Sequence, residues 1–446
     1  MKYEASKRKN ILVVLIVVIL VLCIGLFMKN RMNILNNSFV NEESIVEELD
    51  ENLIGAYIQQ GEEYVKADTI PTSGYEFNEE KSYCKIGDII QGDITLFYDM
   101  DTQTITVSPI TKKGLKCYLY FDEKASGSET ILAQEGGVDV ILAKGTPNFN
   151  NIATADEGMY AAEDDYGTSF YFRGAVQDNW LQFGGFYWRI IRINGNGTIR
   201  IIYNGTSTSQ TGIETQINET RYTFNNTDDN NMYVGYMYQS GQVHGLQTSS
   251  NSKIQLDNWY SNNLHTNYGL YVDGSTGFCG DRTPSTELNS SNGSGGTGIT
   301  TTYYGGLIRL TRSVKSPILQ CNNNDLYTTS DSNDAYPNPS GNGNQALVYP
   351  IGLITADEVA MAGGVYTVNN NNYYLYTGQP YWTMSPYHFN RYNDTLIFGV
   401  NSNGFPVNFH IITAKSGLRP VINLRSDVQI TGSGTVSDPF KVIGAS

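Results

Sequence analysis

The sequence predicts a β-rich α+β protein with one N-terminal membrane-spanning helix, a stalk helix, a small β domain and a larger domain with long loops. Three observations predict this class: an uncharged apolar run near the start, many short runs of β-branched and aromatic residues, and a composition with 45 Gly, 32 Tyr and only 16% charged residues. Short strands separated by Gly-, Asn- and Ser-rich turns are typical of β-rich domains.

The predicted membrane helix is the stretch from Ile11 to Met28, which contains no charged residue. Eighteen helical residues span about 27 Å, close to the thickness of the hydrocarbon core. The sequence Gly25 to Lys29 is a poor signal-peptide cleavage site, so the helix is read as an uncleaved anchor. Basic residues are concentrated before the helix, which predicts a single-pass protein of the cell membrane with a cytoplasmic N-terminus and an extracellular bulk.

Charge argues against a nucleic-acid partner. Residues 1–31, the predicted cytoplasmic tail and anchor, contain six basic residues and one acidic residue, so without them the net charge falls from −15 to −20. Such a surface repels phosphate backbones. We therefore expect no nucleic acid partner, and membrane contact only through the N-terminal helix.

Residues 32–69 are predicted to form a juxtamembrane helical stalk. Apolar residues between positions 42 and 65 fall near one helical face, with a weak point at Gly55. Residues 70–125 read as a small β domain because strand-like runs occur at 93–98, 104–108 and 115–121. Residues 126–155 resemble a linker, with Gly136, Gly137 and Pro147 as breakers.

The larger domain is predicted to cover residues 156–446. Two β-rich runs, 186–193 and 198–203, flank an Asn-Gly turn and predict a hairpin. Thr355 and Glu358 have the spacing of a helix capping box, which argues against a catalytic role for this glutamate. The remaining predicted elements are an amphipathic helix with Leu256, Trp259, Tyr260 and Leu264, a hairpin from 365–368 and 373–376, and a closing hairpin from Val428 onward.

Four cysteines lie beyond the anchor, at Cys84, Cys117, Cys279 and Cys321. An even number outside the cytoplasm suggests two local disulfides, Cys84–Cys117 and Cys279–Cys321. Four buried free thiols are the alternative reading. No C-x-x-C pair occurs, so neither a zinc ribbon nor a thioredoxin-like site is supported.

Few local motifs point to a cofactor. The four histidines have no metal-binding spacing, and neither a nucleophile elbow nor a phosphate-binding loop is present. Asp331, Asn333 and Asp334 offer clustered oxygen atoms that form a weak candidate for a structural Ca²⁺. The glycine and distal glutamate of an EF-hand are missing there, so we expect no other cofactor.

The segment from Tyr381 to His410 is the most informative part of the chain. It combines rigid aromatic side chains with asparagines, a mixture that recognition surfaces use. Trp382, Phe398 and Phe409 are equally suited to a core position. The candidate ligand-binding residues are Tyr387, His388, Asn390, Arg391, Tyr392, Asn403, Phe405, Asn408 and His410.

The fragments GMYAAEDDYGTSFYFRGAV, FGGFYWRIIRINGNGTIRIIYNG, PIGLITADEVAMAGG, YWTMSP, GLRPVINLRSDV and SGTVSDPFKV resemble an uncharacterised family of anchored surface proteins from Firmicutes-type gut bacteria. The W-T-M-S-P run and the later G-L-R-P-V run are similar to the end of C-type-lectin-like domains, a fold shared by the formylglycine-generating enzyme group (sulfatase-modifying factor). The resemblance covers about residues 150–446. It implies that Trp382 and Arg419 belong to the framework and that 386–412 face a ligand. No cysteine follows Cys321, so the activity of that enzyme group is not carried over.

These observations predict a surface binding protein, of the adhesin or receptor kind, for a glycan or protein ligand. Three alternatives stay open. One is a variable receptor of the diversity-generating retroelement kind, which requires a near-copy of the segment beside a reverse transcriptase. Another is a surface enzyme in which His388, Asp394 and His410 supply acid and base groups. The third is a pilin-like structural subunit.

Overall fold

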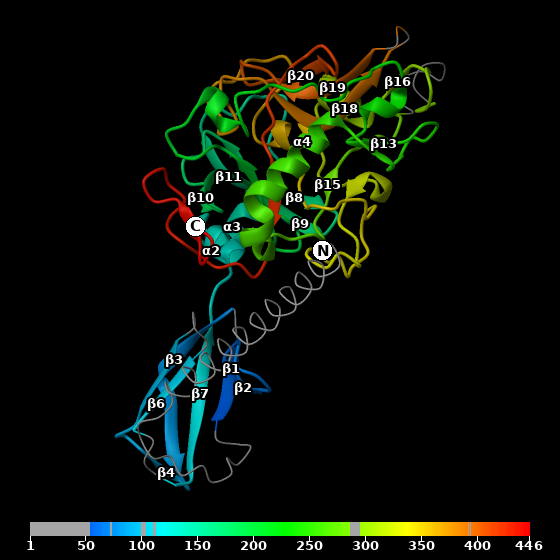
Figure 1. Ribbon diagram of the computed structural model, residues 1–446. Coiled ribbons are helices and arrows are strands. Elements are labelled where there is room, and N and C mark those ends of the chain that lie inside the picture. Colours follow the sequence, from blue (N-terminus) through cyan, green and yellow to red (C-terminus); the bar gives the residue numbers. More distant parts are fainter. Residues whose placement is uncertain are drawn as a thin grey trace, which may run out of the picture. The chain divides into compact units, whose positions relative to one another are not determined.

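The computed structural model describes residues 54–71, 74–99, 104–109, 113–285, 295–390, 392 and 394–446 (Figure 1). It is β-rich, with 35% of residues in strands and 16% in helices, which confirms the predicted β-rich α+β class. The predicted membrane helix and the first part of the predicted stalk lie outside the described residues. Within those residues no helix is both long and apolar enough to cross a membrane.

Two compact units make up the chain. Most of a small N-terminal sheet belongs to the first unit, whereas everything from Phe121 onward belongs to the second, larger unit. The strands of the small sheet have the order β2-β1-β7-β3-β4, and β5 and β6 form a separate hairpin. Their bounds are β1 Ile54–Gln60, β2 Glu63–Ala67, β3 Tyr75–Ile86, β4 Ile89–Ile90, β5 Thr95–Asp99, β6 Thr104–Ser108 and β7 Leu115–Glu123.

The three strands predicted in the small β domain are confirmed as β5, β6 and β7. Strand β7 shows the alternation of buried and exposed residues from which a strand can be predicted. Leu115, Cys117, Leu119 and Phe121 are buried, and the residues between them are more exposed. This alternation places one face of the strand against the core of the sheet.

The predicted stalk helix is wrong over its described part. Residues 54–67 form the strand pair β1 and β2, which turns at Gly61 with a φ of +65°. A left-handed glycine followed by the run Tyr64-Val65 suits a hairpin, because β-branched and aromatic side chains pack well on a pleated sheet. The helical spacing that suggested a stalk depended on residues before position 54, outside the described part.

The predicted linker also contains regular structure. Helix α2, Gly127–Gln134, begins with a capping box between Ser126 and Glu129, and α3, Val138–Ala143, follows. Gly136 and Gly137 separate the two helices, with φ values of +91° and +88°. The glycines therefore end one helix and begin another inside the larger unit, rather than marking a linker.

The larger unit is built on an eight-stranded sheet with the order β21-β12-β11-β10-β23-β22, to which β8 and β9 are added through β11. The predicted hairpin is confirmed as β11 and β12, with Ile190 opposite Ile201. The closing hairpin is also confirmed as β22 and β23. The bounds are β8 Asp156–Asp164, β9 Gly167–Gly174, β10 Trp180–Phe183, β11 Phe186–Ile193, β12 Ile199–Tyr203, β21 Val421–Leu424, β22 Ile430–Thr431 and β23 Phe440–Val442.

The C-terminal strand lies inside this sheet rather than at its edge. Strand β23 pairs in parallel with β10, through Leu181 and Phe440, and antiparallel with β22. Figure 1 shows the C-terminus close to β10 and α2, although more than 260 residues separate it from either element in the sequence. Phe440 and Val442 are fully buried. The last residues of the chain are therefore part of the core.

A second sheet of the larger unit has the order β16-β18-β19-β20, and it contains the segment singled out in the sequence (Figure 1). Trp382 and Phe398 in this sheet are fully buried, in agreement with the core reading for these two residues. The bounds are β16 Thr302–Tyr303, β18 Tyr381–Phe389, β19 Thr395–Val400 and β20 Pro406–His410. Shorter strands are β13 Met237–Tyr238, β14 Thr248–Ser249, β15 Phe278–Cys279 and β17 Leu326–Tyr327.

Helices α4, Asn251–Tyr260, α5, Thr266–Tyr268, α6, Gly305–Thr311, and α7, Ala356–Met361, complete the larger unit. The predicted amphipathic helix is confirmed as α4 and the helical turn after it. The predicted hairpin at 365–368 and 373–376 is wrong. Only a single bridge joins Val365 to Val368, and Tyr373 to Leu375 are buried in turns instead. Burial of these side chains, rather than strand pairing, explains their apolar pattern.

Both disulfides considered from the sequence are present. Cys84 in β3 is bonded to Cys117 in β7, across a separation of 33 residues. Cys279 in β15 is bonded to Cys321, across a separation of 42 residues. One disulfide therefore cross-links the small sheet, and the other ties a loop of the larger unit to a strand.

Candidate ligand-binding site

The structure separates the predicted binding residues into two groups at opposite ends of the β19–β20 hairpin. Asn390 and Tyr392 lie in the turn before β19, close to His410 at the end of β20. Asn403 and Phe405 lie in the turn between β19 and β20. The six residues of β19 place these ends about 17 Å apart at the usual rise per residue. The predicted surface is therefore not one patch.

Two further predicted residues lie between these ends. The Tyr387 hydroxyl is 2.9 Å from the hydroxyl of Tyr366, and the latter donates to Asn408 Oδ1 at 3.5 Å. The Tyr387 ring also packs on the buried Phe398 ring, with centroids 4.9 Å apart. Tyr387 and Asn408 are thus half-buried parts of the sheet surface. Arg391 lies outside the described residues.

The first end of the hairpin carries a group of three side chains that we call the sheet-end cluster: Asp228, Asp394 and His410. His410 Nε2 is 3.1 Å from Asp228 Oδ2 and 3.2 Å from Asp394 Oδ1. All three side chains are partly exposed, by 22% for Asp228, 41% for Asp394 and 25% for His410. The cluster is therefore accessible from solvent.

Local hydrogen bonds fix the sheet-end cluster in place. Asn390 Nδ2 donates to Asp394 Oδ2 at 2.8 Å, and Asn390 Oδ1 accepts from the backbone N–H groups of Tyr392 and Asp394. The Thr395 hydroxyl donates to the backbone carbonyl of Asp228 at 2.5 Å. Asn390 therefore shapes the turn of the hairpin, and Thr395 holds the loop that brings Asp228 to it.

The electrostatics of this end favour an ionised Asp394 and a neutral His388. The hydrogen bond from Asn390, together with His410 and His388, holds the pKa of the Asp394 carboxyl below its usual value. Burial lowers the pKa of His388 to about 4, although Asp394 acts in the opposite direction. His388 lies opposite Leu396, which in turn lies opposite His410, so the two histidines share one face of the sheet.

The sheet-end cluster has the ligands for a divalent cation. Within the described part of the chain it is the one group of three or more His, Cys, Asp or Glu side chains whose ligand atoms lie within 4.8 Å of one another. A Zn²⁺ bonded to each atom at about 2.0–2.2 Å would require ligand separations of about 3–3.5 Å. The two distances from His410 Nε2 fall in this range.

The calcium candidate predicted in the loop is used differently. The side-chain oxygen of Asn333 accepts hydrogen bonds from the backbone N–H groups of Ala335 and Tyr336. Asp331 and Asp334 are exposed. Asn333 therefore stabilises a turn, whereas the sheet-end cluster draws Asp228 from a distant part of the sequence that no motif singled out.

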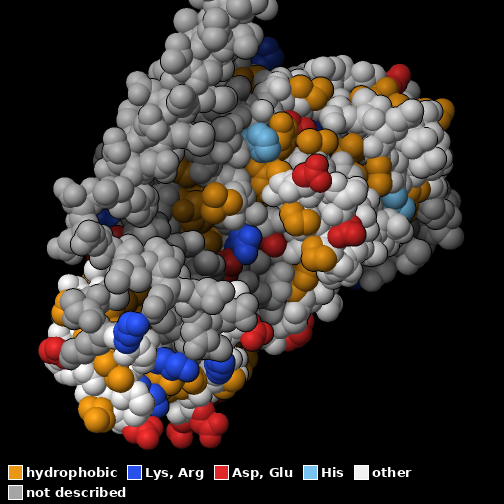
Figure 2. Space-filling model, turned by 60° about the horizontal axis from the view of Figure 1, so that its bottom comes forward, with side chains coloured by type: hydrophobic (Ala, Val, Ile, Leu, Met, Phe, Trp, Pro, Cys, Tyr) orange, Lys and Arg blue, Asp and Glu red, His pale blue; other side chains and the backbone are white. Residues whose placement is uncertain are grey.

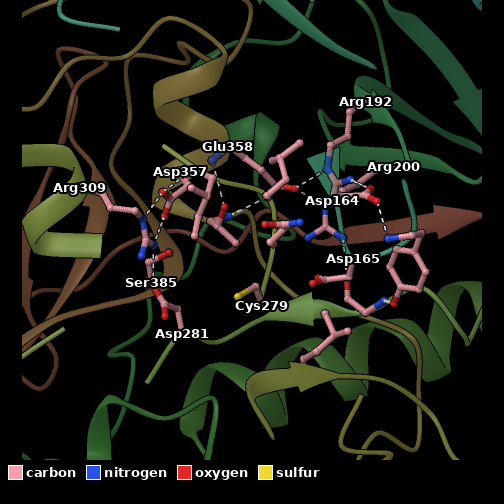
Figure 3. Close-up of a pocket in the computed structure, with 17 residues that line it drawn as sticks. Asp164, Asp165, Arg192, Arg200, Cys279, Asp281, Arg309, Asp357, Glu358 and Ser385 are labelled. Carbon is pink, nitrogen blue, oxygen red and sulfur yellow. Dashed lines mark hydrogen bonds and ion pairs between the residues drawn. The ribbon is translucent and has the colours of Figure 1, made fainter. Parts of the chain in front are cut away.

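A second group of charged side chains lines a narrow recess beside helix α7 (Figure 3). Arg192 pairs with Asp164 at 2.6 Å and with Glu358 at 3.1 Å, and Arg200 pairs with the same Glu358 oxygen at 2.6 Å. Glu358 also accepts the backbone N–H of Thr355 at 2.9 Å. The predicted capping box is therefore confirmed, and the same carboxylate bridges two strands of the central sheet to α7.

On the other side of this recess, a second arginine bridges two carboxylates. Arg309 in α6 pairs with Asp281 at 2.6 Å and with Asp357 at 2.9 Å. Burial raises the pKa of Glu358, but Arg200 and Arg192 outweigh that effect, so its pKa lies below the usual value. The free space between the side chains has room for about one water molecule. The recess is thus a packed ionic network that holds α6 and α7 on the sheet.

Comparison with protein families, curated proteins and solved structures finds no match for the chain. Function therefore has to be argued from the chain's own residues. Of the two charged groups, the sheet-end cluster is the more accessible, and two of its three residues, Asp394 and His410, belong to the predicted binding segment. His388, Asp394 and His410 do gather at one end of the sheet, but none of them lines the ionic recess.

Proposed function

We propose that this chain is a membrane-anchored bacterial surface protein that binds a glycan or protein ligand through a lectin-like C-terminal domain. The observation that carries the proposal is the accessible sheet-end cluster, flanked by Asn390 and by the 71% exposed side chain of Tyr392. Carboxylates and an amide suit the hydroxyl groups of a sugar, and an exposed tyrosine ring suits its apolar face.

Two further observations support display outside the cytoplasm. Both disulfides belong to the described chain, and disulfides persist mainly in oxidising compartments. On the face shown in Figure 2, lysine and arginine side chains of the larger unit are few and scattered. The residues beyond 31 carry a net charge of −20, which suits a soluble ectodomain better than a nucleic-acid-binding protein.

The binding test uses the full chain in detergent on glycan and bacterial-surface arrays. We expect the double variant Tyr392→Ala, His410→Ala to weaken binding by at least about tenfold, as for residues at the centre of an interface. Asn403→Ala, at the other end of the hairpin, is the matched control and should stay within about twofold. Absence of any ligand, or an equal loss in the control, would count against the sheet-end cluster as the site.

The location is tested separately by treating intact cells with a protease. The proposal expects nearly all of the chain beyond residue 31 to be degraded while a short cytoplasmic N-terminal fragment survives. Protection of the larger unit in intact cells, with rapid digestion after lysis, would rule out display at the cell surface.

A further inference from the structure

A third feature of the larger unit is a recess that neither the predicted binding segment nor the ionic network includes. Its walls come from β10, β11, the chain between 204 and 215, and the turn from Tyr374 to Thr377. Its volume is about 210 Å³, which is below the 300–1,000 Å³ of sites for drug-sized ligands, so only a small ligand would fit. We call it the threonine recess, because Thr208, Thr211, Thr215 and Thr377 line it.

The only charged side chain that lines the threonine recess is Arg189, which is 7% exposed. Its guanidinium packs over the rings of Trp180 and Tyr374, at 4.3 and 5.4 Å from their centroids. Nε donates to Asn179 Oδ1 at 2.6 Å and Nη2 donates to the Val176 carbonyl at 2.7 Å. Within the described residues Nη1 has no hydrogen-bond partner, and no carboxylate lies within 4 Å of the group.

Most buried arginines of the larger unit differ from Arg189 in having a counter-ion. Five other buried or half-buried arginines of the larger unit have a carboxylate partner: Arg173, Arg192, Arg200, Arg282 and Arg309. Arg419 is fully buried and also lacks one among the described residues, but it donates to the carbonyls of Tyr203 and Leu375 and to Asn204 Oδ1. Asn204 itself lines the threonine recess.

One buried cation therefore lines this recess, and a second lies behind Asn204 in its wall. Burial lowers the pKa of Arg189 to about 9, and Arg419 acts in the same direction, whereas Tyr374, Asp178 and Asp156 act in the opposite direction. Arg189 is still protonated at neutral pH, so its charge is retained without a partner. A buried charge of this kind is costly unless it is paired. The local field would favour an anion even though the whole chain carries a net negative charge.

Neutral side chains complete the wall of the recess. Thr215 and Thr377 already donate hydrogen bonds, to the carbonyls of Gly212 and Gln379. The hydroxyls of Thr208 and Thr211 make no hydrogen bond within the described chain, and a hydroxyl can both donate and accept. The Tyr374 ring lines the recess, but its hydroxyl is buried away from solvent. The wall thus offers two threonine hydroxyls that suit the hydroxyls of a ligand.

We propose that the threonine recess binds an acidic monosaccharide, with the carboxylate of the ligand on Arg189 and its hydroxyls on Thr208 and Thr211. The guanidinium fork matches a carboxylate in geometry as well as in charge. The two unpaired threonine hydroxyls then match the ring hydroxyls. This site is separate from the sheet-end cluster, so either proposal can fail without the other.

The test measures binding of three probes to the full chain in detergent by calorimetry: glucuronate, glucose and acetate. We expect measurable binding of glucuronate, with glucose and acetate each at least about tenfold weaker. Glucose binding as tightly as glucuronate would overturn the role of the carboxylate. Acetate binding as tightly would overturn the assignment to a sugar, and no binding of any probe would overturn the proposal.

Variants then locate the site. Thr211→Val removes a hydroxyl that makes no hydrogen bond within the described chain, so the fold should persist while glucuronate affinity falls about fivefold. Thr220→Val is the matched control, because Thr220 is also exposed but does not line the recess, and glucuronate affinity should not change. Arg189→Gln should weaken binding by at least about tenfold. Unchanged affinity in Thr211→Val and Arg189→Gln would place the ligand elsewhere.

Discussion

Glu358 shows how far a single residue can be predicted. Its spacing from Thr355 identified it as the third residue of a capped helix, and the cap is present. Its ion pairs to Arg192 and Arg200 could not be predicted, because these arginines lie more than 150 residues earlier and reach it only through the central sheet. Local hydrogen bonds leave a trace in the sequence, whereas pairs between distant elements do not.

The double role of Glu358 gives a stability prediction. Glu358→Gln keeps the length of the side chain, but it leaves the buried guanidinium of Arg200 without a charge partner and leaves Arg192 with Asp164 alone. We expect the free energy of unfolding to fall by about 3–5 kcal/mol, measured by denaturant titration of the larger unit. Glu129→Gln changes the same position of the other capping box, where the side chain is exposed, and should cost less than about 0.5 kcal/mol. Equal losses in both variants would mean that the cap, not the ion pairs, is what Glu358 stabilises.

His388 gives a pH-dependence prediction. The unfolded chain protonates this histidine near pH 6.5, whereas burial delays protonation in the folded chain to about pH 4. The unfolded state therefore binds the extra proton first, and this group lowers the free energy of unfolding as the pH falls from 6.5 to 4. In the variant His388→Gln, the free energy of unfolding should therefore fall less steeply as the pH is lowered through this window. Denaturant titrations at several pH values measure the difference.

Glu135 supplies a control of opposite sign. Burial, reinforced by Asp178, raises the pKa of Glu135 to about 7. The folded chain keeps this proton after the unfolded chain has lost it, so the group favours folding as the pH falls from 7 towards 4.5. In the variant Glu135→Gln, the free energy of unfolding should therefore fall more steeply with decreasing pH than in the parent protein. If the free energy of unfolding changed with pH in the same way in the His388 variant and in the parent, the lowered pKa of His388 would be contradicted.

At the scale of elements, prediction succeeded where the pattern is local. The hairpin of β11 and β12 follows from two β-rich runs around an Asn-Gly turn, and α7 follows from its cap. It failed at β1 and β2, where a few apolar residues fitted a helical period as well as an alternating one. It also failed at α2, because two short helices separated by Gly136 and Gly137 resemble a linker. Short elements with mixed patterns are decided by tertiary packing.

The disulfide between β3 and β7 gives an element-scale prediction. On the chain-entropy model, closing a loop of this length stabilises the native state by about 3–4 kcal/mol. The double variant Cys84→Ala, Cys117→Ala should therefore raise hydrogen exchange throughout the small sheet. Exchange in the larger unit should not change, and the double variant Cys279→Ala, Cys321→Ala should show the reverse pattern. Exchange that rises in both units for either variant would show that the two units do not unfold independently.

At the scale of the whole molecule, the β-rich α+β class could be predicted from the sequence. The site itself could not be predicted, because the sheet-end cluster joins Asp228 to residues more than 160 positions later. The threonine recess is assembled in the same way, from Arg189, the chain after β12 and the turn at Tyr374. Both sites depend on which strands become neighbours, and that information is not contained in any single stretch of sequence.

The interior position of β23 has a consequence for how the protein is made. Because β10 obtains its parallel neighbour from Phe440–Val442, more than 250 residues further along the chain, the central sheet of the larger unit cannot close until that segment has been made. At about 5–20 residues per second, the strands made early wait many seconds with an unpaired edge. A product that stopped before residue 440 would lack Phe440 and Val442, with that edge open to proteases and to other chains.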